Sequence, residues 1–408
     1  MPLKTAGIIA EFNPLHKGHH ILLQAAREGG AEVVLAVMSG NFVQRGEPAL
    51  LPKAYRAEAA LQLGADLVAE LPLPWAMSGA ETFARGGVSL LTGLGAQELW
   101  FGSECGLAAP LWEIARLLET KAFTEAVRKP LETGLSFAAA REKAVELLAG
   151  KERSSLLREP NNTLGIEYCR AILQQKSPMV PCSIRRIGPG HHASSIEDNM
   201  ASGSALRNVL RKKDAFSLEK RGCWKACLPR PSEEGIAEAA KKGECPSRMS
   251  RMENAILSTL RRMKPEDFLR LPDISEGLEN RLFQMAREAS SLEELLISVK
   301  SKRYSLARIR RIVMGAYLGL CVEDAEGFPP YIRILGFTGR GEAYLKTIAR
   351  HLPLPLLTTS AQLKRLEGRE AHIFSLENTA ADLYALSLPK PPPCGEEYRH
   401  RLIKTSES

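Results

Sequence analysis

The sequence predicts an α/β protein whose N-terminal half is a doubly wound parallel sheet, and two observations support this fold class. Short apolar runs alternate with stretches of helical periodicity between residues 6 and 104. These runs are apolar on both faces, which is typical of parallel strands that are covered by helices on each side. The second half of the chain has a different pattern and is expected to be mainly helical, with a small α/β patch.

The first strand is expected at residues 6–12 (AGIIAEF), followed by a helix at residues 19–29 (HHILLQAAREG) that ends at a Gly-Gly pair. The remaining elements of the sheet are expected as strands at residues 32–40, 66–72 and 98–104, with helices at residues 55–65 and 81–95. Residues 109–158 read as charged helices, residues 159–173 as a loop and a helix, residues 179–188 as a further strand, and residues 188–213 as a polar loop that runs into a helix.

Beyond residue 211 the composition changes, so we predict two units. Residues 1–210 would form the catalytic unit, and residues 211–408 a basic, mainly helical region with an α/β patch near residues 331–359. The sequence LPKPPPCGEE near the C-terminus is interpreted as an extended connector.

Composition limits the possible function classes. Hydrophobic residues make up 44% of the 408 residues and charged residues 25%, as in soluble globular proteins. No apolar run reaches the roughly 18 to 20 residues of a membrane span, and the N-terminus lacks the zones of a signal peptide. We therefore expect a cytoplasmic protein that does not enter a membrane. The net charge of +8 suggests a polyanionic partner without choosing between RNA, DNA and lipid.

Eight scattered cysteines fit reduced thiols better than a disulfide framework. The nearest pair, Cys223 and Cys227 in CWKAC, is one residue wider than a C-x-x-C knuckle and has no second pair. Free thiols are therefore favoured over a zinc site, and no metal ligands are assigned.

The loop EFNPLHKGH follows the first predicted strand, where an α/β sheet binds its ligands. Gly18 lets the backbone approach a ligand, and the helix that follows directs free N–H groups at a phosphate. His16 and His19 can add charge-assisted hydrogen bonds, which suits a nucleoside triphosphate attacked at its α-phosphate. Two other interpretations of the histidines remain: a metal site, or capping of the helix.

These residues carry a resemblance to a known family. His16-Lys17-Gly18-His19 is similar to the H-x-G-H signature of the nucleotidylyltransferase superfamily, which has the HUP-like Rossmann-type fold of class I aminoacyl-tRNA synthetases. The chain resembles the bacterial tRNA(Met) cytidine acetate ligase family over nearly its whole length. The matching segments are GIIAEFNPLHKGHH, VMSGNFVQRGEPAL, AELPLPWA, FGSE, EPNNTLGIEYCRAI and RRIGPGHH.

The resemblance implies an ATP-dependent ligase that activates acetate as acetyl-adenylate. The acetyl group would pass to N4 of the wobble cytidine, C34, of elongator tRNA(Met), giving N4-acetylcytidine, AMP and pyrophosphate. ATP would act with Mg²⁺, and acetyl-coenzyme A would not be needed.

The resemblance also implies site residues, with His16 and His19 as the catalytic pair at the phosphates. The ATP-binding signature would comprise Gly7, Ile8, Ile9, Ala10, Glu11, Phe12, Asn13, Pro14, Leu15, His16, Lys17, Gly18, His19 and His20. Further ATP contacts would be Gly102, Asn162, Arg186 and Ile187. Asn161 and Arg185 are adjacent look-alikes, so these two registers stay open.

Three further groups of residues are candidates. MASGSALR resembles the hydroxyl-rich phosphate loop of the superfamily, with Ser202, Ser204 and Arg207, although without the resemblance an ordinary serine N-cap would be favoured. Gln44 and Arg45 follow the second strand and are candidates for contact with substrate or tRNA. The basic candidates for tRNA contact are Lys300, Lys302, Arg303, Arg308, Arg310 and Arg311, with a solvated surface as the alternative.

Two other functions remain open at this point. A small-molecule nucleotidylyltransferase that makes a nucleotide cofactor would explain the first 210 residues but not the basic second half. A non-catalytic RNA-binding protein would not require an intact H-x-G-H motif and hydroxyl-rich loop.

Overall fold

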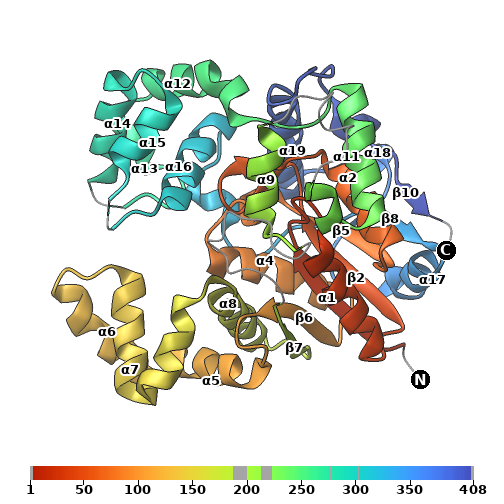
Figure 1. The fold of residues 1–408 in the computed structure, drawn as a ribbon, viewed down its shortest axis with the longest axis horizontal. Helices are drawn as coiled ribbons and strands as arrows, with labels where there is room; N and C mark the ends of the chain where they lie inside the picture. The colour runs from red at the N-terminus through yellow and green to blue at the C-terminus, as the bar shows by residue number, and fades with distance from the viewer. Residues whose placement is uncertain (1–2, 187–199, 213–222, 276, 302, 406–408) are drawn as a thin grey trace.

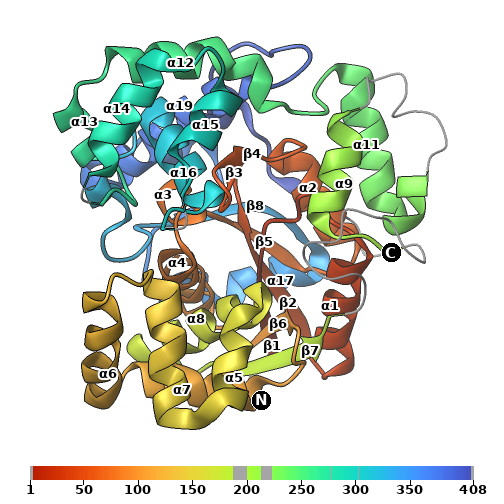
Figure 2. The same ribbon diagram turned by 60° about the vertical axis from the view of Figure 1, so that its left-hand side comes forward.

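The structure is a computed structural model, and it describes residues 3–186, 200–212, 223–275, 277–301 and 303–405. A mainly parallel sheet runs through the centre of the molecule, with helices on both faces (Figures 1 and 2). The order of its strands is β10-β8-β5-β2-β1-β6-β7, and β9 pairs with β8 at the side. Their bounds are β1 (Thr5–Ala10), β2 (Val33–Ser39), β5 (Leu67–Leu71), β6 (Glu98–Ser103), β7 (Val180–Arg185), β8 (Ile332–Thr338), β9 (Leu356–Leu357) and β10 (Ile403–Thr405).

The five strands β5-β2-β1-β6-β7 are all parallel, so the predicted fold class is confirmed. Every residue of β1, β2 and β5 is buried, which explains why these strands are mostly apolar, with Glu70 of β5 as the one charged residue among them. Ala6 and Ile8 pack against α1 (Lys17–Glu28) and α2 (Lys53–Gln62) on one face of the sheet. Ile9 belongs to the core on the other face, which α4 (Ala80–Gly93) and α8 (Pro160–Gln174) cover.

The remaining helices complete the two halves of the chain. The first half adds α3 (Leu73–Ala76), α5 (Ala108–Leu118), α6 (Lys121–Glu132), α7 (Phe137–Ser155) and η1 (Leu156–Arg158). The second half has α9 (Gly203–Arg211), η2 (Cys223–Cys227), α11 (Arg230–Lys242), η3 (Met249–Met252), α12 (Glu253–Arg262), α13 (Pro265–Leu269), α14 (Leu278–Glu288), α15 (Leu292–Val299), α16 (Leu306–Leu318), η4 (Val322–Ala325), α17 (Gly339–Ile348), η5 (Ala349–His351), α18 (Ser360–Leu363), α19 (Gly368–Ala385) and α20 (Glu396–Arg399).

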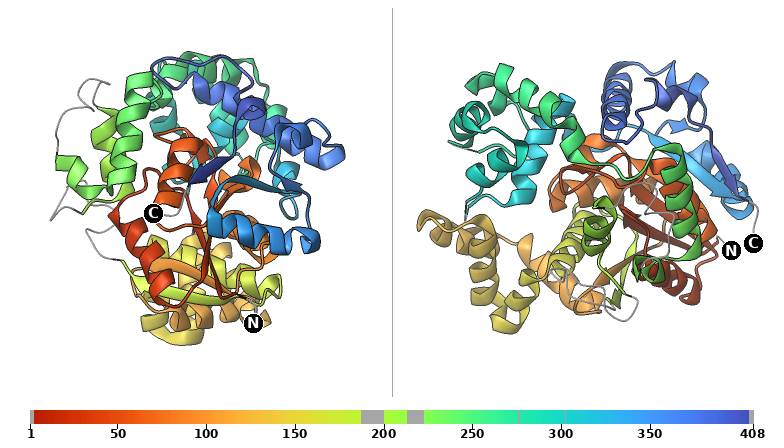
Figure 3. Two further views of the ribbon diagram at one scale, coloured as in Figure 1. Left: turned by 90° about the vertical axis from the view of Figure 1, so that its right-hand side faces the viewer. Right: turned by 45° about the horizontal axis from the view of Figure 1, so that its top comes forward.

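The sheet continues across the proposed boundary at residue 210. Strand β8, from the expected α/β patch, pairs antiparallel with β5, and β10 pairs parallel with β8. Helices α12 to α16 share a separate apolar core with α19, and they form a lobe beside the sheet (Figure 3). The sequence patterns did not predict α3, α19, β10 or the hairpin β3 (Phe42–Val43) to β4 (Glu47–Pro48).

A buried cluster of charges, the ion cluster, joins the C-terminal segment to this sheet. Its five members are Lys53, Glu70, Arg333, Glu377 and Glu397. Lys53 Nζ lies 2.7 Å from both Glu70 Oε1 and Glu397 Oε1, and Arg333 Nη1 lies 2.5 Å from Glu397 Oε2. Although burial alone would raise it, Arg333 and Lys53 lower the pKa of Glu397 to about 2, so this carboxylate stays charged between its two cations.

Candidate functional site

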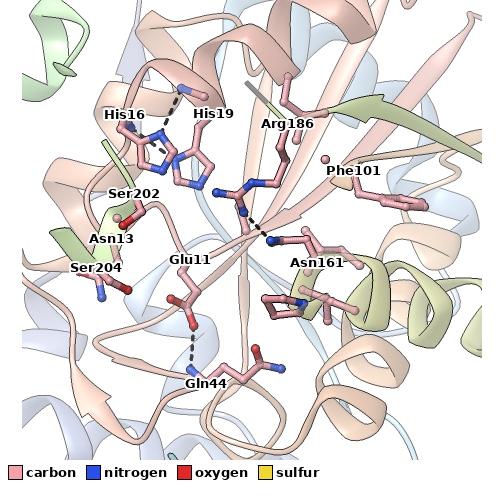
Figure 4. A pocket seen from close by; sticks show the side chains of 18 of the residues that line it. Glu11, Asn13, His16, His19, Gln44, Phe101, Asn161, Arg186, Ser202 and Ser204 are labelled. Atoms are coloured by element: carbon pink, nitrogen blue, oxygen red, sulfur yellow. Dashed lines mark hydrogen bonds between the residues drawn. The ribbon is translucent and has the colours of Figure 1, made fainter. Parts of the chain in front are cut away.

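A pocket of about 320 Å³ opens at the carboxyl ends of β1 and β6 (Figure 4). Strand β1 lies between β2 and β6, so the helices that follow β1 and β6 leave in opposite directions and the sheet opens a crevice there. The polar lining includes Glu11, Asn13, His16, His19, Gln44, Arg45, Asn161, Arg185, Arg186, Ser202, Ser204 and Arg207. The apolar lining includes Ile9, Leu22, Phe83, Phe101, Leu164, Tyr168 and Ile184.

The backbone of the loop after β1 is fixed from beneath by a buried arginine. Arg56 of α2 donates from Nη1 to the carbonyl oxygens of Glu11 (2.7 Å) and Ser39 (3.0 Å), at the ends of β1 and β2. Asn13 Oδ1 accepts from the N–H of Leu50 at 2.8 Å. These bonds hold the histidine loop in place before any ligand binds.

His16 and His19 begin helix α1 and cap it reciprocally. Nδ1 of His16 accepts from the N–H of Gly18 at 3.1 Å, and Nδ1 of His19 accepts from the N–H of His16 at 3.3 Å. The rings stack with their centroids 4.0 Å apart, and Phe12 packs edge-on against His19. The capping interpretation therefore holds for Nδ1 of both rings, and Nε2 is left available to a ligand in the pocket.

Both histidines are neutral in this setting. Burial lowers the pKa of His16 to about 3, and Arg186 and Arg207 contribute to this shift. The pKa of His19 is lowered well below its usual value by burial, by His16 and by the same two arginines. Because each Nδ1 accepts, the ring proton lies on Nε2. Nε2 is thus the nitrogen of each ring that can donate to a ligand, and Arg186 and Arg207 supply positive charge beside it.

The phosphate-loop candidates lie beside the histidines at the start of α9. Ser202 Oγ caps this helix by accepting from the N–H of Ala205 at 3.1 Å, as the simpler interpretation expects. Ser204 Oγ accepts from Arg207 Nη2 at 3.2 Å and from Arg45 Nη1 at 3.1 Å. Ser202, Ser204, Arg45 and Arg207 therefore meet at one wall of the pocket.

Glu47 and Asn13 hold Arg207 in this position. Arg207 Nη1 donates to the carbonyl oxygen of Asn13 at 2.7 Å, and its Nε lies 3.1 Å from Glu47 Oε1. Burial alone would raise the pKa of Glu47, but Arg211 and Arg207 lower it to about 2. The sequence patterns did not predict a part for Glu47 or Arg211 in the site. Glu47 pairs with both Arg207 and Arg211, and it is brought to them by the hairpin β3–β4, which the patterns did not predict.

Asn161 and Asn162 lie differently with respect to the other wall of the pocket. Asn161 lines the pocket, and its Oδ1 accepts from Arg186 Nη1 at 2.6 Å. Asn162 is buried beneath it, where its Oδ1 accepts from the N–H of Cys105 at 3.1 Å. Asn161 therefore has the position expected of a ligand contact, and Asn162 supports the segment that follows β6, the strand that contains Gly102.

Arg186, Arg185 and Gly102 all line the pocket. A Cβ on Gly102 would meet Cγ of Arg186 at 3.2 Å, so a side chain there would crowd this arginine and the space beside it. Ile187 falls outside the described residues.

Half of the histidine signature lines the pocket, namely Ile9, Ala10, Glu11, Asn13, His16, Gly18 and His19. The other half supports it: Gly7, Ile8, Phe12, Pro14, Leu15, Lys17 and His20 are not among the lining residues. Gly7 is needed for close packing, because a Cβ there would lie 2.7 Å from Leu91 of α4. The sequence did not predict that the aromatic residues Phe83, Phe101 and Tyr168 line the pocket. Their spacing along their helices and strand is the same as that of ordinary core residues.

The basic candidates from residue 300 onward separate into two kinds. Arg308 Nε donates to the carbonyl oxygen of Asp273 at 2.8 Å, and Arg311 Nε lies 2.5 Å from Asp273 Oδ2, so both support the lobe. Arg311 also reaches the carbonyl oxygen of Gln44 at 3.4 Å, which links α16 to the rim of the pocket. Lys300 and Arg303 are exposed, Arg310 is partly exposed, and Lys302 lies outside the described residues.

Two properties of the described residues bear on metals and membranes. Among them, no three His, Cys, Asp or Glu side chains are grouped so as to hold a metal ion. The side chain of Cys223 lies outside this part, so the pair in CWKAC is untested. No helix within it combines the length and the apolar character that crossing a bilayer requires.

Comparisons with known proteins give one consistent result. The family model described as HIGH Nucleotidyl Transferase matches residues 3–397. The protein named tRNA(Met) cytidine acetate ligase from Acetivibrio thermocellus is 34% identical over 98% of this chain and 100% of its own length. The protein of the same name from Thermoanaerobacter pseudethanolicus is 36% identical over 98% and 99%.

Two crystal structures of Thermotoga maritima TmcAL have the same fold. The structure bound with alpha-thio ATP has a TM-score of 0.90 and 30% identity, over 99% of this chain and 100% of that one. The apo structure has a TM-score of 0.92 and 31% identity over the same shares. The chain therefore belongs to the tRNA(Met) cytidine acetate ligase family of HIGH nucleotidyl transferases.

Proposed function

We propose that this protein uses ATP to activate acetate as acetyl-adenylate and transfers the acetyl group to N4 of C34 in elongator tRNA(Met). The observation that carries this proposal is the pocket at β1 and β6, where two neutral histidine donors at the start of α1 face Arg45, Arg186 and Arg207. The names of the relatives support the ligase reaction and its tRNA, and the bound alpha-thio ATP of the TmcAL structure supports ATP as the substrate.

The first step joins acetate to AMP. A carboxylate oxygen of acetate attacks the α-phosphorus, the new P–O bond forms, and pyrophosphate leaves with the electron pair of the bond that breaks. Charge accumulates on the phosphoryl oxygens during this displacement. Nε2–H of His16 and His19 and the guanidinium groups of Arg186 and Arg207 would donate to these oxygens, and Mg²⁺ would accompany the nucleotide, held mainly by its phosphates.

The second step transfers the acetyl group to the tRNA. Acetate is a poor acyl donor and the exocyclic amine of cytidine is a poor nucleophile, whereas a mixed anhydride with AMP has a good leaving group. The protein then mainly positions the two reactants, an effect worth several kcal/mol at well-oriented sites. This reaction requires no acetyl-coenzyme A.

An isotope experiment tests the adenylate. With acetate labelled with ¹⁸O in the carboxylate, we expect the AMP product to contain one labelled oxygen, because the attacking oxygen stays on phosphorus when the amine takes the acetyl carbon. Mass spectrometry of AMP and of nucleosides from the tRNA measures both products. Formation of N4-acetylcytidine with unlabelled AMP, or from acetyl-coenzyme A alone, would show that the mechanism is different.

A salt titration tests the RNA partner. If Lys300 and Arg303 contact tRNA phosphates, replacing both by glutamine should reduce the slope of log affinity against log salt by about 0.7 to 0.9 for each lost contact. Filter binding with tRNA(Met) at several salt concentrations measures the slope, and Lys346→Gln, on the far helix α17, is the control. An unchanged slope in the double variant would place the RNA surface elsewhere.

A further inference from the structure

Glu11 is out of place in a pocket that would bind phosphates. Among the described residues that line the pocket it is the only carboxylate, and the other charged lining residues are arginines. A carboxylate repels a polyphosphate, so phosphate binding does not explain this residue. In Figure 4 its side chain projects into the pocket between the histidines and Gln44.

The position of the Glu11 carboxyl group is well defined. Its backbone carbonyl is held by Arg56, and its Oε1 accepts from the N–H of Gln44 at 3.0 Å. The charged and titratable groups near it are Arg207 of α9, Arg45 and Glu47 of the hairpin, Arg56 of α2 and Tyr168 of α8. The carboxyl group therefore lies between the phosphate-side arginines and the hairpin loop, at a fixed place in the pocket.

The environment of Glu11 makes its carboxylate a stronger base than an ordinary one. Burial raises the pKa of this carboxyl above its ordinary value, and Glu47 adds to the shift, while Arg207, Arg45 and the bond from Gln44 oppose it. A carboxylate with a raised pKa is a stronger base than an ordinary one, and general bases work best when their pKa lies near the working pH.

We propose that Glu11 is the base that removes a proton from N4 of cytidine during acetyl transfer, an inference that rests on the proposed function above. The N4–C bond forms while the bond from the acetyl carbon to the AMP oxygen breaks, and AMP leaves with that electron pair. One N4 proton passes to a carboxylate oxygen of Glu11, and the product amide keeps the other. The positive charge that develops on the amine is stabilised by the same carboxylate.

The test separates the two steps in the variant Glu11→Gln. The glutamine side-chain oxygen can still accept from Gln44, so the loop is retained while the base is lost. We expect acetyl transfer from the preformed adenylate to tRNA(Met) to slow by about 10² to 10⁴-fold more than acetate-dependent release of pyrophosphate in the first turnover. Glu11→Asp should recover part of the transfer rate, and Glu58→Gln, an exposed change on α2, is the matched control.

The pH profile gives a second test that needs no substitution. In the unaltered protein the transfer rate should rise with pH through the ionisation of Glu11, and the variant Glu11→Gln should lack this rise. Unchanged transfer in Glu11→Gln, equal losses of both steps, or a transfer rate in the unaltered protein that does not depend on pH would overturn the proposal. A protein that releases no pyrophosphate with acetate would instead overturn the proposed function itself.

Discussion

Replacing His19 by alanine should slow formation of the adenylate by about 10² to 10³-fold, the usual cost of removing one donor to charge that develops in a transition state. Nε2–H of His19 is lost, whereas the arginines around it remain. The fold should survive, because the only helix-capping bond removed is the one from the N–H of His16. Such caps are worth about 1 kcal/mol. Acetate-dependent exchange of pyrophosphate into ATP measures the step, and a thermal melt checks the fold.

His351→Ala is the matched control, since His351 is an exposed histidine in η5. His16→Ala should show a similar loss of rate with a larger loss of stability, because the ring of His16 is the side-chain cap of α1. A folded His19→Ala protein with nearly normal exchange would refute the role of this histidine at the phosphates.

Glu397→Ala should lower the free energy of unfolding by about 3 to 5 kcal/mol, because it leaves two buried cations to share one close carboxylate. Lys53 and Arg333 of the ion cluster both lie against this carboxylate, at 2.7 Å and 2.5 Å. Glu70 would then be the one carboxylate of the ion cluster close to the two cations. Glu377 cannot replace Glu397, because its Oε2 lies 3.9 Å from Arg333 Nη1. Burial and Glu70 also raise the pKa of Glu377 to about 8, which favours its uncharged form. Urea unfolding followed by circular dichroism measures the change.

Glu238→Ala provides the contrast. Its ion pair with Lys242 has the same separation of 2.7 Å, but the two side chains are 57% and 54% exposed. Exposed pairs of this kind contribute about 0.3 to 0.5 kcal/mol on a helix. Equal losses for Glu397→Ala and Glu238→Ala would mean that the buried cluster does not hold the C-terminal segment to the sheet.

The parallel sheet and the position of the site could be predicted because their signals are local. The strands β1, β2 and β5 are mostly apolar runs, and the histidine loop follows the first of them. The short strand β10 has no such signal. It is three residues long and only partly buried, so its pairing with β8 depends on distant contacts that no periodicity reports.

The chemical state of the site could not be predicted for a similar reason. The neutral form of His16 depends on its burial beside Arg186 and Arg207, and these arginines come from distant parts of the chain. The choice between Asn161 and Asn162 depends on the direction in which α8 starts, because neighbouring residues on a helix face different ways. The support that Asp273 gives to Arg308 and Arg311 is likewise a contact between helix α16 and the segment that joins α13 to α14, and not a property of either segment alone.

The crossing of β8 into the sheet sets an order of events during synthesis. Strand β5 leaves the ribosome long before β8, the strand that pairs with its free edge, and Glu397 follows later still. Domains generally fold from the N-terminus while the chain is being made. Until β8 is made, β5 is the edge strand of the growing sheet, although all of its residues are buried in the complete fold. An unpaired edge strand of this kind is a template for mispairing with other chains. The site can thus take shape early, while protection of the nascent sheet from aggregation waits for the second half of the chain.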